Sequence, residues 1–400
     1  MSEDDFSRVC SKIEEEKEFL NSVSQKIWNN PELGYKEEKA HETLTSALYR
    51  CGFQVQKRYL LPTAFKAEYT SKSEGGPVVG VLLEYDALPN IGHACGHNLI
   101  AEAGLAASLG VKAAMEADPK LAGKLVVLGT PAEEGGGGKI ALLNMGAFNG
   151  IDVAMMVHPI NFTSTFPPIL NRLSIIVDFK GKEAHAAAFP WEGRNALDAA
   201  VAAYQNIGLL RQHIKPASRI HAIITKGGVS PNVIPAESRL ELYARAETQS
   251  DLTELTDCIT KCVESGATAA RCTASIEYKH KYHYLNLVSN KIMGVTYDYY
   301  AQKLGIIPTD FPPGAVIPTG STDMGNVSHV IPSIHPFYDI GTEAVNHTKE
   351  FTQACGDPES QGPTLRVAKA LAMTALQLMR CPDTLQKVKK QFEADIAQGL

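Results

Sequence analysis

Four short segments of the chain carry side chains that bind metal ions. They are residues 92–98 (GHACGHN), 131–134 (PAEE), 158–159 (HP) and 346–348 (NHT). Each offers a thiolate, an imidazole or a carboxylate, which are the usual ligands of zinc and related divalent ions. The first three segments follow apolar runs typical of strands, so we expect their side chains to meet at one edge of one sheet. Such a site would make the chain a hydrolase with a bound divalent metal.

Cys95 and His97 are separated by Gly96. Side chains two residues apart do not share a helix face. They can point the same way from extended or turning backbone, and glycine permits a tight turn. A cysteine binds metal as the thiolate, because coordination removes its proton. The alternative is a buried cysteine beside an ordinary loop histidine, but the flanking His93 and the ligand candidates downstream favour the metal site.

Glu133 and Glu134 follow an apolar run and precede four glycines at 135–138. Adjacent side chains on extended backbone point in different directions, so we expect different tasks for them. We assign Glu134 as a metal ligand and Glu133 as the general base that activates water and passes its proton to the leaving amine. Glycine-rich loops also hold phosphates, but this segment lacks the first glycine and the Ser or Thr of a Walker loop. Nucleotide binding is therefore rejected.

Two distant histidines, His158 and His347, complete the set of ligand candidates. Each alone would more often be a packed or surface histidine, so their assignment depends on the other ligands. Asp86 precedes Pro89 in the segment 86–89 (DALP) and is a candidate to orient a ligand histidine. Its alternative role is to cap the turn before the proline.

Two polar loops in the middle of the chain are candidates for contact with a substrate. One contains His185, and the other is residues 230–235 (SPNVIP), which contain Asn232. A histidine and an asparagine amide are suited to stabilising a tetrahedral oxyanion. Taken alone, such loops are more often structural.

The elements around the metal-binding segments alternate between strand and helix. Strand candidates at 78–83, 125–128 and 153–158 alternate with helix candidates at 99–117 and 139–145, after an N-terminal helix candidate at 6–29. Asn98 is placed to cap the helix that follows it. This alternation predicts an α/β fold with a mixed, mostly parallel sheet covered by helices.

From about residue 172 the order of elements changes. It becomes strand, helix, strand, strand, helix and strand, at 173–179, 196–212, 219–225, 238–245, 251–269 and 273–278. This order is that of a ferredoxin-like α+β unit. Its single sheet leaves edges that need cover, so pairing with a second copy is expected.

From about residue 284 the chain returns to the first domain. The expected elements there are a helix, a Pro/Gly-rich stretch, a strand or loop and a last helix, at 287–304, 308–320, 330–340 and 364–379. We therefore predict a metal-binding catalytic domain of residues 1–171 and 284–400, with residues 172–283 inserted as a dimerisation and lid domain.

The composition favours small solutes as partners. The chain has 400 residues, 44% of them apolar, and a net charge of -6 that is spread along the sequence, so nothing indicates binding to nucleic acid or to a membrane surface. The N-terminus is acidic and polar, and no apolar run reaches the roughly 18 residues of a membrane span. Eight scattered cysteines suit a reducing compartment. We expect a cytoplasmic protein.

These segments resemble those of the metallopeptidase family of aminoacylases, glutamate carboxypeptidases and auxin-conjugate amidohydrolases, across nearly the whole chain. The matching motifs are 86–89 (DALP), 92–97 (GHACGH), 131–138 (PAEEGGGG), 158–159 (HP), the His185 loop and 232–235 (NVIP). Within the family the likeness is strongest to animal dipeptidases that cleave β-alanyl-lysine, through residues 92–102, 129–134, 190–193, 320–323 and 346–348.

The resemblance implies a two-domain subunit, a homodimer and up to two Zn²⁺ or Mn²⁺ ions per subunit. It implies Glu133 as the base and five metal ligands: Cys95, His97, Glu134, His158 and His347. It also implies that His185 reaches into the partner subunit's site, and that Asn232 and Arg245 contact the substrate. The chain departs from most relatives at Cys95, where they have an acidic residue, and from the amidohydrolases at Asn98, where they have Asp.

The leading hypothesis is metal-dependent hydrolysis of an amide or dipeptide bond that joins a small acyl or β-aminoacyl group to lysine, ornithine or arginine. An N-acyl-amino-acid or auxin-conjugate amidohydrolase would use the same machinery, and the motifs do not separate the two. A catalytically silent protein with structural metals is a third hypothesis, but a closed structural site has no use for the spare carboxylate of Glu133. The soft ligand Cys95 favours zinc, and the nitrogen and oxygen ligands are compatible with manganese.

Overall fold

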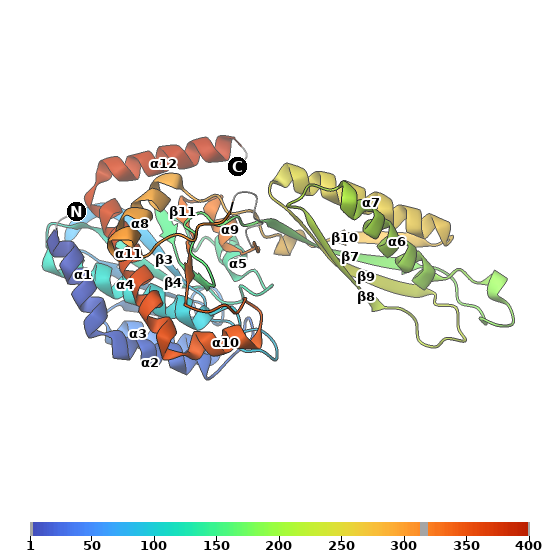
Figure 1. The fold of residues 1–400 in the computed structure, drawn as a ribbon, viewed down its shortest axis with the longest axis horizontal. Coiled ribbons are helices and arrows are strands. Elements are labelled where there is room, and N and C mark those ends of the chain that lie inside the picture. The colour runs from blue at the N-terminus through green and yellow to red at the C-terminus, as the bar shows by residue number, and fades with distance from the viewer. Residues whose placement is uncertain (1–2, 313–318, 399–400) are drawn as a thin grey trace. The chain divides into compact units, whose positions relative to one another are not determined.

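The computed structural model describes residues 3–312 and 319–398. These residues form two compact units, and the chain passes between the units after Pro167 and after Leu287, with a short return of Thr319–Gly325 to the second unit. The second unit is the green and yellow part of the ribbon in Figure 1. The Pro/Gly-rich stretch expected at 308–320 lies partly outside the described residues.

The first unit contains a six-stranded sheet. Its strands are β1 (Gln54–Lys57), β2 (Phe65–Thr70), β3 (Ser73–Leu83), β4 (Ala122–Gly129), β5 (Val153–Met155) and β11 (Ser333–Ile334). They lie in the order β1-β2-β4-β3-β5-β11. The last four of these are parallel, whereas β2 is antiparallel to β4 and β1 is antiparallel to β2. The predicted fold class, a mixed and mostly parallel sheet, is confirmed.

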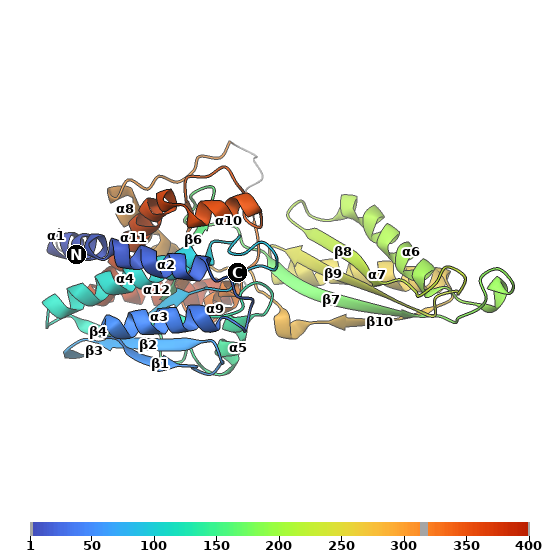
Figure 2. The same ribbon diagram turned by 90° about the horizontal axis from the view of Figure 1, so that it is seen from below.

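Helices surround this sheet. They are α1 (Glu3–Glu15), α2 (Lys17–Trp28), α3 (Glu38–Arg50), α4 (His97–Ala117), α5 (Gly138–Asn144), α8 (Lys291–Lys303), α10 (Lys349–Gly356), the short helix η4 (Pro358–Ser360), α11 (Gln361–Arg380) and α12 (Pro382–Ala397), with α9 (Met324–Ser328) at the boundary of the units. Figure 2 shows α3 and α4 running alongside β1 to β4. Because helices cover the sheet, side chains of its central strand such as Val79, Val81 and Leu83 are at most 1% exposed.

Three predicted elements of this unit were wrong. The single helix expected at 6–29 is two helices, because the chain turns at Glu16 and both α1 and α2 pack on α4. The strand expected at 153–158 ends at Met155, and a separate strand β6 (His158–Ile160) begins at His158 and pairs in parallel with β12 (Phe337–Asp339). The helix expected to be the last is followed by α12, which has proline at its first position.

The predicted cap at Asn98 was also wrong. The helix α4 begins one residue earlier, at His97, and Gly96 is its N-cap. The Asn98 amide instead donates hydrogen bonds to Ser24 Oγ (3.1 Å) and to the Cys355 carbonyl (2.9 Å). Asn98 therefore joins α4 to α2 and α10.

The second unit is a four-stranded antiparallel sheet with two long helices. Its elements are β7 (Asn171–Lys180), η1 (Pro190–Glu192), α6 (Ala196–Leu210), η2 (Arg211–His213), β8 (Arg219–Lys226), β9 (Glu237–Ala246), α7 (Gln249–Ala269), β10 (Thr273–Tyr278) and η3 (His280–Tyr282). The strand order β10-β7-β9-β8 and the two helices on one face give the predicted ferredoxin-like arrangement (Figure 1). Along β9, Leu240, Leu242 and Ala244 are buried beneath the helices, so Tyr243 and Arg245 project from the opposite face.

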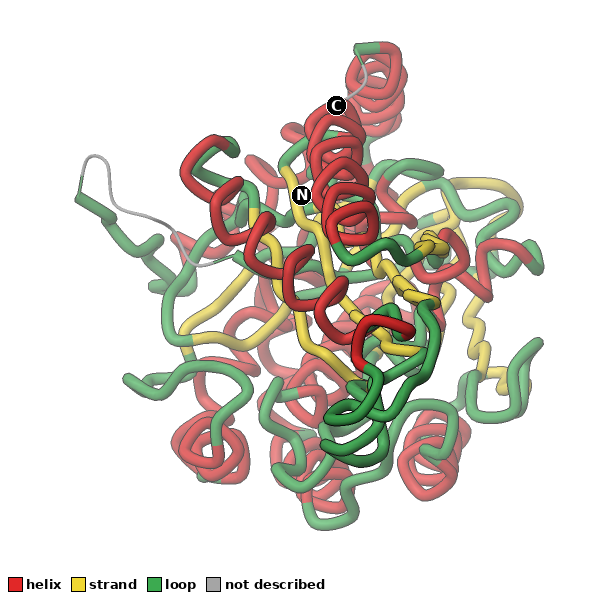
Figure 3. The backbone as a smooth tube through the Cα atoms, turned by 90° about the vertical axis from the view of Figure 1, so that its right-hand side faces the viewer, coloured by secondary structure: helices red, strands yellow, loops and turns green. Residues whose placement is uncertain are grey.

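Figure 3 shows the backbone with helices in red and strands in yellow. Among the residues that the structure describes, no helix is both long and apolar enough to cross a membrane.

One carboxyl group is buried in the core of the first unit. Glu102, on α4, is 0% exposed, and its Oε1 accepts a hydrogen bond from Gln361 Nε2 (3.4 Å). Its Oε2 has no hydrogen-bond partner within residues 3–312 and 319–398. Burial, only partly offset by hydrogen bonds from Ser24 and Gln361, raises the pKa of Glu102 to about 7.

We expect Glu102→Gln to stabilise the protein at pH 8 and to change its stability little at pH 5. The folded pKa of Glu102 is about 7, whereas an unfolded glutamate has a pKa of about 4.3. The native state therefore binds more protons between these two values, so stability falls as pH rises through this window and stays lower above pH 7. The amide avoids this loss, which is on the order of 3–4 kcal/mol at pH 8. Urea unfolding of both proteins in the presence of a chelator, at pH 5 and at pH 8, measures the difference in free energy of unfolding. An equal gain in stability at the two pH values would contradict the raised pKa of Glu102.

Candidate metal centre

The loop after β3 places Cys95 and His97 at the carboxyl end of the sheet. Gly96 lies between them with φ 75°, a left-handed conformation that glycine adopts without strain. A Cβ at this position would lie 2.5 Å from Pro159 Cγ and 3.1 Å from Cys355 Sγ. Gly96 is thus required both by the turn and by the close packing, and it allows His97 to start α4.

Asp86 fixes the orientation of His97. Its Oδ1 lies 3.0 Å from Nδ1 of His97, and its Oδ2 accepts a hydrogen bond from the backbone N of Glu134 (2.9 Å). Burial opposes ionisation of Asp86, but the neighbouring His97 outweighs it and leaves the pKa of Asp86 below its usual value. One carboxylate therefore holds the Nδ1 side of the imidazole, leaves Nε2 facing the site, and ties the first metal-binding segment to the second.

Glu133 and Glu134 follow β4 in a tight turn. Ala132 has φ 58°, and a Cβ on Gly138 would lie 1.7 Å from the Pro131 carbonyl oxygen, so glycine is needed where the turn closes. Glu134 Oε1 lies 3.5 Å from His347 Nε2 and 3.9 Å from His97 Nε2. Glu133 Oε2 also lies 3.9 Å from His97 Nε2. The two carboxylates thus approach the same imidazole.

His158 approaches the site from the start of β6. Its Nδ1 lies 2.9 Å from the Pro159 carbonyl oxygen, and its Nε2 lies 3.4 Å from Cys95 Sγ. Burial lowers the pKa of His158 to about 4, so its imidazole is neutral at physiological pH and has a lone pair available for a metal.

The C-terminal segment is attached to the other segments through its backbone and through Asn346. The backbone N of His347 donates to the Ala94 carbonyl (2.8 Å), and Asn346 Nδ2 donates to the Pro159 carbonyl (3.2 Å). His347 has φ 67°, a conformation that residues other than glycine adopt at a cost and that is common at functional sites. Its side chain is 56% exposed, whereas that of Glu134 is 13% exposed, so His347 lies on the open side of the cluster.

The five ligand candidates come together, and they fit one or two divalent ions. Ligand atoms lie within 4.8 Å of one another in three groups: Cys95/His97/His158, Cys95/Glu134/His347 and Glu84/His97/Glu133. His97 Nε2 and Glu134 Oε1 are buried and have no hydrogen-bond partner in the described part of the chain, a costly state that a cation would relieve. Burial raises the pKa of the Cys95 thiol well above its usual range, so a thiolate at this position needs a bound cation.

The other three residues singled out in the sequence lie in the second unit. His185 is exposed, and its loop packs on the Asn232 loop, where the Ala186 N donates to the Asn232 carbonyl (3.0 Å). Arg245 Nη1 donates to Ser321 Oγ (2.8 Å). Arg245 pairs with Arg172 at the start of β7, whereas His185 follows the far end of that ten-residue strand. These two ends of the sheet are about 30 Å apart, so the second unit offers two separate groups of polar residues.

The sequence interpretation missed Glu84, Lys139 and His335, which are buried beside the ligand candidates. Lys139 Nζ lies 2.5 Å from Glu84 Oε1, and the ring of His335 lies 5.5 Å from that of His158 between centroids. A signal for Glu84 was present, because it stands two residues before Asp86 and side chains two apart on extended backbone share a side. The sequence contained no comparable signal for the other two.

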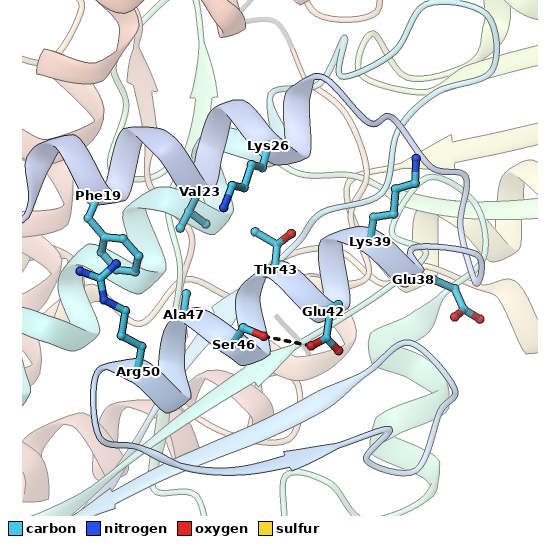
Figure 4. Close-up of a pocket in the computed structure, with 10 residues that line it drawn as sticks. All are labelled: Phe19, Val23, Lys26, Glu38, Lys39, Glu42, Thr43, Ser46, Ala47 and Arg50. Atoms are coloured by element: carbon cyan, nitrogen blue, oxygen red, sulfur yellow. Dashed lines mark hydrogen bonds between the residues drawn. The ribbon is translucent and has the colours of Figure 1, made fainter.

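A groove of about 590 Å³ between α2 and α3 is separate from the metal centre. It is lined by Phe19, Val23, Lys26, Glu38, Lys39, Glu42, Thr43, Ser46, Ala47 and Arg50 (Figure 4). The Arg50 guanidinium lies 4.2 Å from the centre of the Phe19 ring, and Ser46 Oγ donates to Glu42 Oε1 (3.0 Å). Arg50 and Glu42 thus contact neighbouring side chains of the groove, and none of the predicted site residues lines it.

Comparison with known proteins identifies the family of the chain. A family model of the peptidase dimerisation domain matches residues 170–270. The Xaa-Arg dipeptidase of Mus musculus is 46% identical over 407 aligned residues, which cover 98% of this chain and 93% of the mouse protein. The chain belongs to the M20 family of peptidases and amidohydrolases. The family predicted from the motifs is thereby confirmed.

Other M20 relatives extend the likeness. One of the p-aminobenzoyl-glutamate hydrolase subunits of Escherichia coli is 33% identical over an alignment covering 66% of this chain and 59% of the bacterial protein. The fold matches the crystal structure of a dinuclear metal-binding M20 peptidase from Bacillus subtilis, with a TM-score of 0.65, 19% identity, and coverage of 90% of this chain and 98% of the bacterial one. The M20 fold therefore extends over both units.

Proposed function

We propose that this M20 protein is a metal-dependent dipeptidase that cleaves the amide bond between a small acyl or β-aminoacyl group and a basic C-terminal amino acid. The observation that carries the proposal is the meeting of three metal-binding groups around Cys95 and His97 with the carboxylate of Glu133 beside them. The names of the mouse and human Xaa-Arg dipeptidases, 46% and 45% identical to the chain, support a basic residue on the leaving side.

The residues divide the chemistry of hydrolysis between them. A bound divalent metal supplies Lewis acidity toward the scissile carbonyl and toward water. Glu133 takes the proton of the attacking water and returns it to the leaving amine, a task that requires a carboxylate beside the reacting atoms. Asp86 holds the ring of His97 so that Nε2 faces the site, and the Pro159 carbonyl does the same for His158 through Nδ1.

The donor set supports zinc more than manganese. Cys95 occurs in two of the three groups of ligand atoms, so its sulfur would help to hold the metal. Thiolate is a soft ligand and selects zinc over manganese, whereas imidazole and carboxylate bind both. We assign zinc as the resident ion, with manganese as the alternative, and up to two ions per subunit.

The protein is proposed to act as a cytoplasmic homodimer. The strand β8 is the edge of its sheet, and apolar side chains near it are exposed, among them Ile223 (63%) and Val201 and Tyr204 on α6 (39% and 38%). An edge strand beside apolar side chains is a surface that a second copy would cover. All eight cysteines lie in the described residues and are free, which suits a reducing compartment.

The two groups of polar residues in the second unit then serve different sites. His185 and Asn232 lie at one end of the sheet, and Arg245 lies at the other, about 30 Å away. A dipeptide is much shorter than this distance, so one substrate cannot contact both groups of one subunit. We propose that Arg245 contacts a bound substrate, and that His185 and Asn232 serve a different site, that of the partner subunit, and stabilise the oxyanion there.

A substrate panel with metal analysis on the same preparation tests the proposal. We expect β-alanyl-lysine and β-alanyl-arginine to be cleaved with kcat/KM at least about 10-fold above β-alanyl-alanine, because alanine lacks the charged group that a site for basic residues would hydrogen-bond. Chelation should abolish turnover while the protein stays folded. Faster cleavage of N-acetyl-lysine or indoleacetyl-aspartate would favour the alternative of an N-acyl-amino-acid or auxin-conjugate amidohydrolase. A metal-loaded preparation that cleaves no substrate of the panel would favour the hypothesis of a catalytically silent protein.

A further inference from the structure

The ligand His97 lies between two carboxylates, of which Asp86 orients the ring. The other is Glu84, which follows the last residue of β3 and stands two residues before Asp86. Asp86 Oδ1 contacts Nδ1 of His97 at 3.0 Å, and Glu84 Oε2 lies 3.5 Å from the other ring nitrogen, Nε2. The Nε2 atom is the one that faces the metal-binding groups.

The contact between Glu84 and His97 brings together two atoms that need a proton or a cation between them. With Nδ1 donating its proton to Asp86, an imidazole that carries no second proton has a lone pair at Nε2. Glu84 Oε2 also has only lone pairs, and neither atom has a hydrogen-bond partner among the described residues. Both side chains are 0% exposed, and the two atoms are 3.5 Å apart, which leaves no room for a water between them. Two buried acceptors that face each other need a shared proton or a shared cation.

Lys139 explains how a further carboxylate is held at this position. Its Nζ lies 2.5 Å from Glu84 Oε1, and both side chains of this pair are 0% exposed. A lone buried carboxylate beside Asp86, Glu133 and Glu134 would be costly, whereas one paired with an ammonium group is tolerated. The pairing occupies Oε1, so Oε2 is the oxygen that remains for a metal.

We propose that Glu84 is a sixth ligand of the metal centre and binds, through Oε2, the same ion as His97 Nε2. Glu84, His97 and Glu133 form a group whose ligand atoms lie within 4.8 Å of one another. Of this group, Glu84 is held away from solvent at the end of β3, whereas Glu133 has the proposed role of the base. The assignment rests on the proposed metal centre, and it gives the ion at His97 a fixed carboxylate that does not take part in proton transfer.

Binding of Zn²⁺ alone to the full-length apoprotein tests the assignment without measuring turnover. Titration against a competing chelator gives the affinity of each ion, and X-ray absorption of the zinc-loaded protein gives the number of nitrogen and oxygen donors. We compare Glu84→Gln combined with Lys139→Met, Lys139→Met alone, and Glu102→Gln. The last is a matched control, because it also removes a buried carboxylate that has one unpaired oxygen.

The double variant should bind one of its ions at least about 10-fold more weakly and lose one oxygen donor. Lys139→Met should bind as tightly as the wild type or more tightly, because Glu84 then gives its full charge to the metal. Glu102→Gln should be unchanged. A pair that only stabilises the fold would instead leave the zinc affinity of both Lys139 variants unchanged while lowering their urea midpoints.

The inference is overturned if the folded double variant keeps wild-type affinity and donor number, or if Lys139→Met alone weakens zinc binding 10-fold. The second criterion still applies if the double variant fails to fold. Wild-type protein that binds no zinc would remove the proposed function together with this inference. Wild-type protein that binds zinc while the double variant binds it equally well would remove the role of Glu84 alone.

Discussion

Glu133→Gln is expected to lower kcat by about 10²–10⁴-fold and to leave the zinc content unchanged. The amide has the size of the carboxylate but cannot accept a proton from water. Glu133 Oε2 lies 3.9 Å from His97 Nε2, close to the centre, and the side chain is 9% exposed, so glutamine can take its place without a change in packing. Steady-state kinetics on β-alanyl-lysine and metal analysis of the same sample measure both quantities.

The neighbouring carboxylate provides the matched control for this experiment. Glu134 Oε1 faces both His347 and His97 and has no hydrogen-bond partner among the described residues, as expected for a ligand. Glu134→Gln should therefore reduce the zinc content as well as turnover, whereas Glu133→Gln reduces turnover only. If Glu133→Gln retained activity, or if it lost metal while Glu134→Gln did not, the two roles would have to be exchanged.

The sequence predicted that the metal-binding segments lie close together, because the parallel sheet brings the loops after its strands to one edge. The runs at 78–83 and 125–128 are apolar enough to be buried on both faces, which is typical of central parallel strands. The carboxyl ends of such strands lie at one edge, so residues in the loops after β3 and β4 come close together. The position of His347 could be proposed only by its residue type, since it depends on a backbone hydrogen bond to Ala94 that no local pattern records.

The features that the sequence did not predict depend on tertiary contacts. The turn at Glu16 exists because two helices must pack on α4, and the residues around it form good helix on their own. Asn98 was expected to cap a helix, but Gly96 in a left-handed conformation starts that helix a residue earlier and leaves the amide to join α2 and α10. The pair of Glu84 and Lys139 joins residues 55 positions apart, and nothing in either segment specifies the other.

The roles of the second unit can be tested because each site is expected to be built from two subunits. His185→Ala should lower kcat by about 10²–10³-fold, as loss of an oxyanion donor does, and Glu133→Gln should be inactive as well. A mixture of the two variants should recover about a quarter of wild-type activity after subunit exchange. Half of the dimers then contain one copy of each variant, and each mixed dimer has one site with both Glu133 and His185 intact.

The geometry of the second unit supports this expectation. His185 and Asn232 occupy one end of the sheet, with their loops joined by the hydrogen bond from Ala186 N to the Asn232 carbonyl, so they should act on the same site. A mixture of His185→Ala with Asn232→Ala should therefore recover no activity. A mixture of Glu133→Gln with Glu134→Gln should also recover none. In both mixtures every site of a mixed dimer carries one of the two defects. Recovery limited to the mixture of Glu133→Gln and His185→Ala would place His185 in the partner's site. Mass spectrometry must show that mixed dimers form. If they form and no activity is regained, His185 acts within its own subunit or has no role in catalysis.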